Sequence, residues 1–436
     1  MQQIIVSGGH SLSGQVFLQG AKNTALPMIA LSILTSRSLR IGNFPSIVDT
    51  QINLDLIRDC GGIVDQIGDT VIIDTANFSA CELDPVKTIL TTASTYFNPV
   101  IVRRFGSIIT GYSGGDEIGG VNRFGVNSEV VAFYNALGIS VKPLSDKKLE
   151  FSLSKKSEKQ IFFRRKFFGQ TIQALLFLAI GERNSSFEII NPSIEPEVLE
   201  IINTLNTLGA DIVHLPSENK IVIHRVKELS GGSVNICSDP NELVTYVSMA
   251  LATNSQLVIE GIDFSHKIKV FFDILDRIKA KYDFDQSGCL TIFPSKNELV
   301  NLRIVADFWP SECHTDWQQL LTPLLSLTRG KSCIVDNVFP KRFTSSQSLS
   351  EMGGRYKKTG CCLNIFGPTT FLPKNLTLPK DIRGASSILI AALTAKGTSV
   401  LLDQGQLSRG LSCFEKKLRL LGAQIEVQSD SILIPV

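Results

Sequence analysis

The chain has 436 residues, of which 43% are hydrophobic and 19% are charged, and its formal net charge is +2. This length predicts two or three domains of ordinary globular composition. The nearly balanced charge excludes a protein whose bulk surface is built to bind nucleic acid or membrane lipid. Nine scattered cysteines form no CxxC pair and no metal-ligand spacing, and no apolar run reaches the roughly 18 residues of a membrane span. We therefore expect a soluble cytoplasmic protein with reduced thiols and no metal.

Near the start of the chain, the segment "GAKN" precedes an apolar stretch that reads as a helix. Further on, the loop "GYSGGDEIGG", Gly111 to Gly120, contains five glycines and two adjacent acids, Asp116 and Glu117. Glycine-rich loops often cradle phosphate, but two carboxylates would repel it. The acids therefore argue against a phosphate cradle, and the family resemblance given below implies instead that the glycines are hinges of a mobile lid, which needs positions that absorb backbone change.

A weak repeat of roughly 70 residues runs through the chain, longer than the repeats of about 20–50 residues found in solenoids. Each copy has a helical pattern, a turn at glycine or alanine, and β-rich runs. A helix followed by a hairpin cannot bury both faces alone, so six copies predict one closed body, or two bodies of three. The six copies are 55–74, 133–153, 201–226, 274–294, 349–367 and 417–436.

The third copy shows the pattern most clearly. Val198, Ile201 and Leu205 lie at helical spacing, and Gly209 is suited to the left-handed conformation that ends a helix. The runs "DIVHL" and "KIVIHRV" then predict a hairpin from their β-branched content.

The six repeats together with "SGQVFLQGAKNTALPMIAL" resemble the enolpyruvyl transferases, and in particular the UDP-N-acetylglucosamine 1-carboxyvinyltransferase branch, over essentially the whole chain. The resemblance implies an α/β fold of two inside-out barrel domains with three helix-plus-strand repeats each. It implies one domain over 22–236 that carries a mobile lid, and a second over 1–21 and 237–436. The active site is expected in the cleft between them.

The family's reaction moves an enolpyruvyl group from phosphoenolpyruvate to the 3-hydroxyl of UDP-N-acetylglucosamine and releases phosphate, the first committed step of peptidoglycan precursor synthesis. The resemblance implies that Lys22 and Arg409, from "LSRG", bind phosphoenolpyruvate and serve catalysis. Arginine suits this role because its planar fork binds phosphate or carboxylate with two hydrogen bonds. Asn23 is expected to contact the sugar nucleotide.

Asp316, in "ECHTDWQQLLTPLL", matches the aspartate that contacts the sugar 3-hydroxyl and is the family's proposed general base. Because an apolar helix follows it, Asp316 could instead be a helix N-cap or first-turn acid. The same stretch suggests a Cys313–His314 dyad, which we disfavour because adjacent side chains usually point apart.

Further matches concern the UDP-sugar. The basic run "IFFRRKFFGQT" could by itself suggest nucleic acid or a membrane surface, but it stands alone on a nearly neutral chain. Acids at the start of a helix could equally be favourable helix-dipole charges. The positions that the resemblance assigns to UDP-sugar binding are Arg165, Glu195, Glu197, Asp316, Arg342, Asp381 and Arg383.

The chain departs from the family in two places. Where the family has an arginine shortly after "VKT", this chain offers only Leu90, Thr91 or Thr92. Losing one charge-assisted contact to the ester costs about 1.5–3 kcal/mol. The register of a second family arginine is uncertain, and we assign its phosphoenolpyruvate-binding role to Arg123.

Asp116 occupies the lid position where the family usually has cysteine. We predict that Asp116 is the general acid and that the enzyme works best at lower pH than cysteine relatives. Unperturbed aspartate has a pKa of about 3.9 against about 8.5 for cysteine, so Asp116 needs burial or a negative neighbour to hold a proton.

Two alternatives stay open: an enolpyruvyl transferase with a different acceptor, and a non-catalytic UDP-sugar-binding paralogue. We expect no cofactor, no nucleic-acid or membrane partner, and a monomer or weak homo-oligomer.

Overall fold

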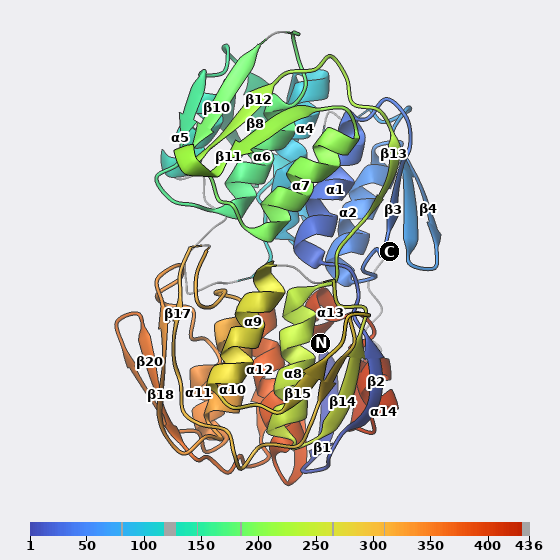
Figure 1. Ribbon diagram of the computed structural model, residues 1–436. Helices are drawn as coiled ribbons and strands as arrows, with labels where there is room; N and C mark the ends of the chain where they lie inside the picture. The colour runs from blue at the N-terminus through green and yellow to red at the C-terminus, as the bar shows by residue number, and fades with distance from the viewer. Residues whose placement is uncertain are drawn as a thin grey trace. The chain divides into compact units, whose positions relative to one another are not determined.

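The computed structural model describes residues 1–79, 82–116, 128–145, 147–183, 185–263, 266–308 and 310–429. The chain divides into two compact units, and each has the same construction (Figure 1). Unit 1 contains Met1–Gln19 and Cys237–Val436, with Asp116 alongside, and unit 2 contains Gly20–Gly115 and the later segment that ends at Ile236. Each unit is an α/β body with helices inside and sheets outside.

Three small sheets surround the helices of unit 2. In order of pairing, the first sheet is β11 (Asp211–Leu215), β12 (Lys220–His224), β10 (Ser186–Ile190) and β9 (Gln160–Phe162). The second is β13 (Gly232–Asn235), β3 (Leu39–Gly42), β5 (Thr70–Asp74) and β4 (Ile63–Ile67), and the third is β6 (Ser107–Gly111), β8 (Lys148–Leu153) and β7 (Ile139–Ser145). The helices are α1 (Lys22–Leu31), α2 (Val48–Asp59), α3 (Pro85–Thr88), α4 (Phe97–Phe105), α5 (Ser128–Leu137), α6 (Phe168–Leu178) and α7 (Pro196–Thr207).

Unit 1 repeats this plan. Its sheets are β21 (Asn375–Thr377), β22 (Gly397–Asp403), β1 (Gln2–Gly8) and β23 (Gln424–Ser429); β15 (Tyr282–Phe284), β16 (Leu290–Ile292), β14 (Gln256–Glu260) and β2 (Ser13–Phe17); and β17 (Arg303–Ala306), β18 (Gly330–Asp336), β20 (Cys362–Gly367) and β19 (Tyr356–Thr359). Its helices are α8 (Pro240–Ala252), α9 (His266–Arg277), α10 (Trp317–Leu325), α11 (Ser346–Glu351), α12 (Ile382–Thr394), α13 (Gln406–Gly410) and α14 (Phe414–Leu420).

The inside-out arrangement follows from where apolar residues lie on the helices. Every residue of α8 and of α10 is buried, which requires protein on all sides of each helix. The strands instead alternate between buried and part-exposed residues, as in β18 and β22, so one face of each sheet meets solvent. The helices therefore form the centre of each unit.

The predicted repeat is confirmed in its elements. The third copy forms α7 followed by the β11–β12 hairpin, in which Ile212 pairs with Ile223, and Gly209 has φ +101°. Glycines in four other copies also adopt the left-handed conformation, but the fourth copy uses Lys279, with φ +59°. In the last copy, β23 pairs with the N-terminal strand β1, and the second predicted β-rich run lies outside the described residues.

Candidate active site

Lys22 is the first residue of α1, and its side chain is buried in unit 2. Its Nζ lies 2.6 Å from Oδ2 of Asp49, which is itself buried in the first turn of α2. A buried ammonium requires such a partner, because an unpaired charge in the interior is costly. Asn23 follows Lys22 on α1 and is half-buried. The sequence identified Lys22 but gave no signal for Asp49, which lies 27 positions further on.

The paired glutamates begin helix α7. Glu195 is the N-cap residue and Glu197 lies in the first turn, and both are buried. The Glu195 side chain makes no capping hydrogen bond, so the structure does not support a capping role for it. Helix α1 packs against α7, where Thr24 Oγ1 donates to Glu200 at 2.7 Å. Arg165 is exposed in the loop before α6.

The base of the glycine-rich loop packs tightly against residues 88–92. Thr92, one of the three residues (90–92) among which the resemblance predicts an arginine, donates from Oγ1 to the carbonyl of Gly114 at 2.6 Å. A Cβ on Gly114 would lie 1.5 Å from the carbonyl oxygen of Ile89, and Gly115 has φ +107°. These two glycines are therefore required by close backbone approach and by a left-handed conformation, in addition to any role as hinges. Glu117 and Arg123, which carried two of our expectations, lie outside the described residues.

Asp116 forms an ion pair in unit 1 with Arg409. Its Oδ1 lies 2.8 Å from Nη1 of Arg409, a buried residue of the short helix α13. The same Nη1 donates to Oε1 of Gln406 at 2.9 Å. The Asp403 carboxylate at the end of β22 accepts the backbone N–H groups of Gln406 and Leu407, which fixes the start of α13. Two predicted site residues that are 293 positions apart thus meet in the fold.

Two aspartates and two arginines form a second cluster in unit 1. Arg342 Nη1 lies 2.5 Å from Asp316 Oδ1, and its Nε donates to Asp381 Oδ2 at 3.0 Å. Arg383 Nε lies 3.7 Å from Asp316 Oδ2. Asp381 caps α12 by accepting the N–H groups of Arg383 and Gly384. The structure therefore joins Asp316, Arg342, Asp381 and Arg383 in one network.

The charges in this network keep Asp316 ionised. Burial by itself would raise the pKa of the Asp316 carboxyl, but the positive charges of Arg342 and Arg383 outweigh it and hold that pKa well below its ordinary value. Burial likewise opposes the charge of Arg342, yet Asp381 and Asp316 raise its pKa. Asp316 stands at the N-cap position of α10 but makes no capping hydrogen bond, so its carboxylate is used by the arginines instead.

One guanidinium nitrogen of this network makes no hydrogen bond to the described residues. Arg342 is 2% exposed, and its guanidinium is used by the two aspartates. Arg383 is also buried, but its Nη1 has no hydrogen-bond partner among the described residues. A buried guanidinium N–H without a partner is costly unless a ligand supplies an acceptor.

The Cys313–His314 dyad is not formed. The Cys313 Sγ contacts the carbonyl oxygen of His314 at 3.3 Å, and burial raises the pKa of this thiol. A thiol held protonated in the interior is a poor nucleophile.

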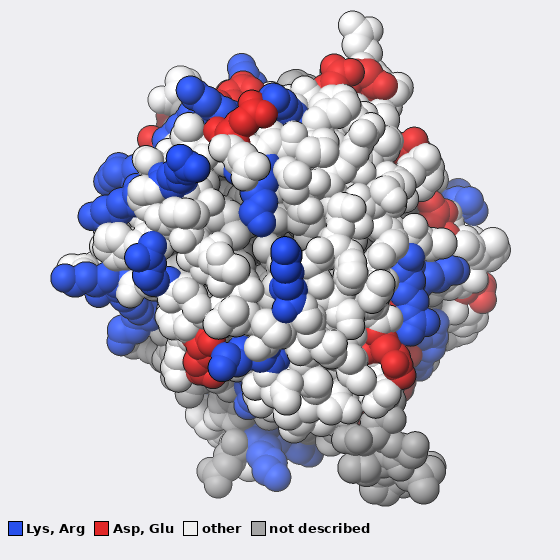
Figure 2. Space-filling model, turned by 90° about the horizontal axis from the view of Figure 1, so that it is seen from below, with Lys and Arg blue, Asp and Glu red and all other residues white. Residues whose placement is uncertain are grey.

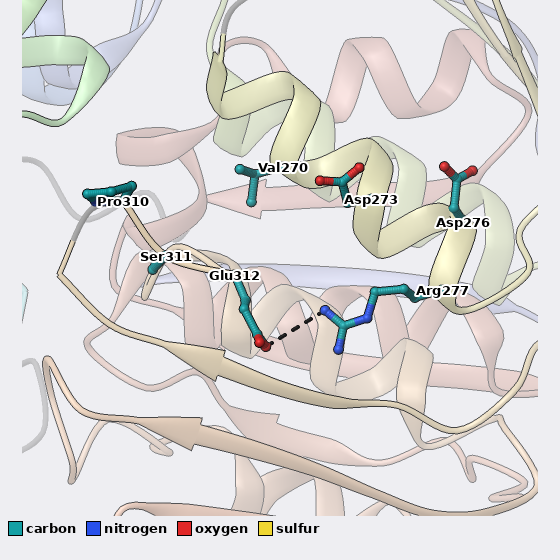
Figure 3. A pocket seen from close by; sticks show the side chains of 7 residues that line it. All are labelled: Val270, Asp273, Asp276, Arg277, Pro310, Ser311 and Glu312. Carbon is teal, nitrogen blue, oxygen red and sulfur yellow. Dashed lines mark ion pairs between the residues drawn. The ribbon is translucent and has the colours of Figure 1, made fainter.

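A separate pocket of about 750 Å³ lies between α9 and residues 310–312 of unit 1 (Figure 3). It is lined by Asp273, Asp276 and Glu312, and Arg277 pairs with Glu312 at 3.7 Å. None of the predicted site residues lines it.

Neither the charges on the face drawn in Figure 2 nor the potential metal ligands among the described residues indicate a further site. On the face seen in Figure 2, basic and acidic side chains are interspersed among uncharged ones. Within the described ranges there is no group of three or more potential metal ligands. No helix in the described part of the chain is long and apolar enough to cross a membrane.

Comparison with known proteins shows the class to which this chain belongs. The family model of EPSP synthase (3-phosphoshikimate 1-carboxyvinyltransferase) matches residues 6–418. The chain belongs to this family of carboxyvinyltransferases.

Curated relatives match at low identity over nearly the full length. The UDP-N-acetylglucosamine 1-carboxyvinyltransferase of Borreliella burgdorferi is 28% identical and is aligned over 98% of this chain and 99% of its own length. The enzyme of the same name from Lactobacillus johnsonii is 27% identical, with the same two shares.

Two solved structures share the fold. The enolpyruvyl transferase NikO from Streptomyces tendae has a TM-score of 0.87 at 24% identity and covers 98% of each chain. EPSP synthase from Acinetobacter baumannii has a TM-score of 0.72 at 15% identity, over 98% of this chain and 100% of its own.

Proposed function

We propose that this protein transfers the enolpyruvyl group of phosphoenolpyruvate to the 3-hydroxyl of UDP-N-acetylglucosamine and releases phosphate. The observation that carries the proposal is the network around Asp316, in which a carboxylate held ionised lies beside a buried arginine with an open donor. The names of the curated relatives support the choice of acceptor. The reaction would serve peptidoglycan precursor synthesis in the cytoplasm.

We assign phosphoenolpyruvate binding to Lys22, Arg123 and Arg409, because a phosphate ester with several negative charges needs cationic partners. The ammonium of Lys22 is held in place by Asp49, and the guanidinium of Arg409 by Gln406. Such preorganised cations lose little freedom when an anion binds.

The chemistry needs one base and one acid. We assign Asp316 as the group that accepts the proton of the sugar 3-hydroxyl as its oxygen attacks C2 of phosphoenolpyruvate. Asp116 delivers a proton to the methylene carbon, and loss of phosphate with return of that proton regenerates the vinyl group. Because the two arginines hold its pKa low, Asp316 is in the carboxylate form that can accept this proton.

The remaining assignments concern the UDP-sugar. Because Arg342 and Asp381 bind each other, we propose that they position Asp316, and that the open Nη1 of Arg383 contacts the ligand. Asn23, Arg165, Glu195 and Glu197 are assigned to the sugar nucleotide on the strength of the family motif.

Phosphate release from phosphoenolpyruvate tests this function. We expect release with UDP-N-acetylglucosamine, and none with shikimate 3-phosphate or without acceptor. Release of phosphate only with another nucleotide sugar would show that this sugar, and not UDP-N-acetylglucosamine, is the acceptor. Binding of the UDP-sugar without release under any condition would instead indicate a non-catalytic paralogue, which the lack of an arginine at positions 90–92 favours.

A further inference from the structure

Arg409 is held rigidly before any substrate arrives. Its helix α13 starts at Gly405, with φ +92°, and the Asp403 carboxylate fixes the first turn through two backbone N–H groups. Gln406 then binds Nη1 of Arg409 at 2.9 Å. The guanidinium therefore presents its Nη1 edge in one direction.

The Asp116 carboxylate lies against that same edge, 2.8 Å from Nη1. The two side chains are 17% and 9% exposed, so the pair is shielded from most solvent. Carboxylate and phosphate oxygens bind a guanidinium in the same way, through charge-assisted hydrogen bonds. A multiply charged ester placed at Nη1 would also repel the Asp116 carboxylate at contact distance.

We propose that Asp116 acts as an internal competitor for the anion site of Arg409, so that phosphoenolpyruvate binds there only by displacing the Asp116 carboxylate. The inference rests on the proposed function, in which Arg409 binds the ester. A lid cysteine, which is mostly a neutral thiol at pH 7, does not compete in this way. Substrate binding and release of the acid are thus coupled in this chain through one arginine.

The test measures equilibrium binding of phosphoenolpyruvate, and separately of inorganic phosphate, to the wild type and to Asp116→Asn. We expect Asp116→Asn to bind both ligands about five-fold more tightly, as expected for loss of one partly buried ion pair, and to lose turnover. Asp283→Asn, at an exposed position of β15, makes the same change in net charge and should leave both affinities unchanged.

Asp116→Cys is a second variant, expected to bind the ester as tightly as Asp116→Asn while keeping turnover. Unchanged or weaker binding by both Asp116 variants would overturn the competition while leaving the function intact, since the wild type binds. Absence of phosphoenolpyruvate binding by all the proteins would overturn both proposals.

A second observation, independent of the first, concerns His314. Its ring is buried, and Nδ1 accepts the backbone N–H of Asp316 at 3.2 Å. The centroid of this ring lies 6.0 Å from that of the Trp317 ring. The indole N–H of Trp317 donates to Oδ1 of Asn241 at 3.0 Å.

We infer that His314 is a positioning residue that fixes the backbone of Asp316, and so the direction of its carboxylate between Arg342 and Arg383. This also rests on the proposed role of Asp316. Asparagine can present an acceptor near the position of Nδ1, whereas leucine cannot.

Steady-state kinetics of His314→Asn and His314→Leu test the role. We expect His314→Leu to lower kcat about tenfold with an unchanged KM for phosphoenolpyruvate, and His314→Asn to restore most of it. Equal losses in the two variants, or no loss in either, would overturn the role of Nδ1. A wild type without turnover would overturn it together with the proposed function.

Discussion

At the scale of single residues, several charged side chains of the proposed site are each paired with a side chain of opposite charge. Lys22 with Asp49, Arg409 with Asp116, and Arg342 with Asp316 and Asp381 are all buried or nearly so. Removing one partner of a buried pair leaves an uncompensated charge, which is strongly destabilising. Variants that remove a whole charge must therefore be compared with variants that keep it.

The pH dependence of the base should respond to Arg383. Two arginines hold the pKa of Asp316 low, and Asp316 is an active base only above that pKa. Arg383→Gln removes one positive charge and should raise this pKa, so that activity is lost at a higher pH as the solution is acidified. The profile of kcat/KM against pH measures the shift, and Arg383→Lys, which keeps the charge, should shift it less. An acid limb at the same pH in wild type and Arg383→Gln would contradict the account.

The pH–rate profile also tests whether Asp116 is the general acid. If Asp116 donates the proton, Asp116→Asn should remove an ionisation from the pH–rate profile, and the wild type should be most active at lower pH than Asp116→Cys. In the structure Asp116 is paired with Arg409, so the proposed acid role requires Asp116 to leave this cation before it donates a proton. A profile unaltered by Asp116→Asn would exclude Asp116 as the acid.

The absence of a lid thiol predicts resistance to fosfomycin, which alkylates that thiol in cysteine relatives. Activity should persist at fosfomycin concentrations that inactivate Asp116→Cys. A covalent adduct on Asp116, detected by mass spectrometry, would contradict this prediction.

At the scale of elements, the base of the glycine-rich loop depends on one close backbone contact. Gly114→Ala would place Cβ against the Ile89 carbonyl and should destabilise the protein by about 3 kcal/mol or more, seen as a lower Tm. Gly169→Ala is the matched control, because a Cβ there would meet only the Tyr96 hydroxyl at the ordinary distance of 3.7 Å. Equal Tm values for the two variants would contradict the prediction, because they would show that the loop base shifts to accommodate the added Cβ without loss of stability.

Periodicity predicted the elements well because it depends on local chemistry. Helix α7, its glycine stop and the β11–β12 hairpin were all predicted from apolar spacing and β-branched residues. The sequence could not predict that the fourth turn would use Lys279, because a strained φ is imposed by the surrounding fold. Nor could it predict that β1 would pair with β23, since that pairing joins the two ends of the chain.

The site was predicted less completely, for the same reason. Motifs indicated Asp316 and Arg409 one at a time, but the ion pair of Arg409 with Asp116 connects residues far apart in the chain. Asp49 and Gln406, which fix the two cations, have no distinguishing neighbours in the sequence. Partners of this kind are visible only once the fold has brought them together.

At the scale of the whole molecule, two units of like construction carry complementary groups. Unit 2 contains Lys22 and the paired glutamates, and unit 1 contains Asp116, Arg409 and the network of Asp316. Unit 1 lacks Lys22, and unit 2 lacks Arg409 and both the proposed acid and the proposed base. We therefore expect that neither unit expressed alone transfers an enolpyruvyl group.

The central claim is that the chain joins the enolpyruvyl group to UDP-N-acetylglucosamine. Mass spectrometry of the nucleotide sugar after incubation with phosphoenolpyruvate tests it most directly. The account predicts a product heavier by one enolpyruvyl group, formed in equal amount to the phosphate released and absent with Asp316→Asn. An unmodified UDP-N-acetylglucosamine, recovered in full while phosphoenolpyruvate binds to the protein, would contradict it.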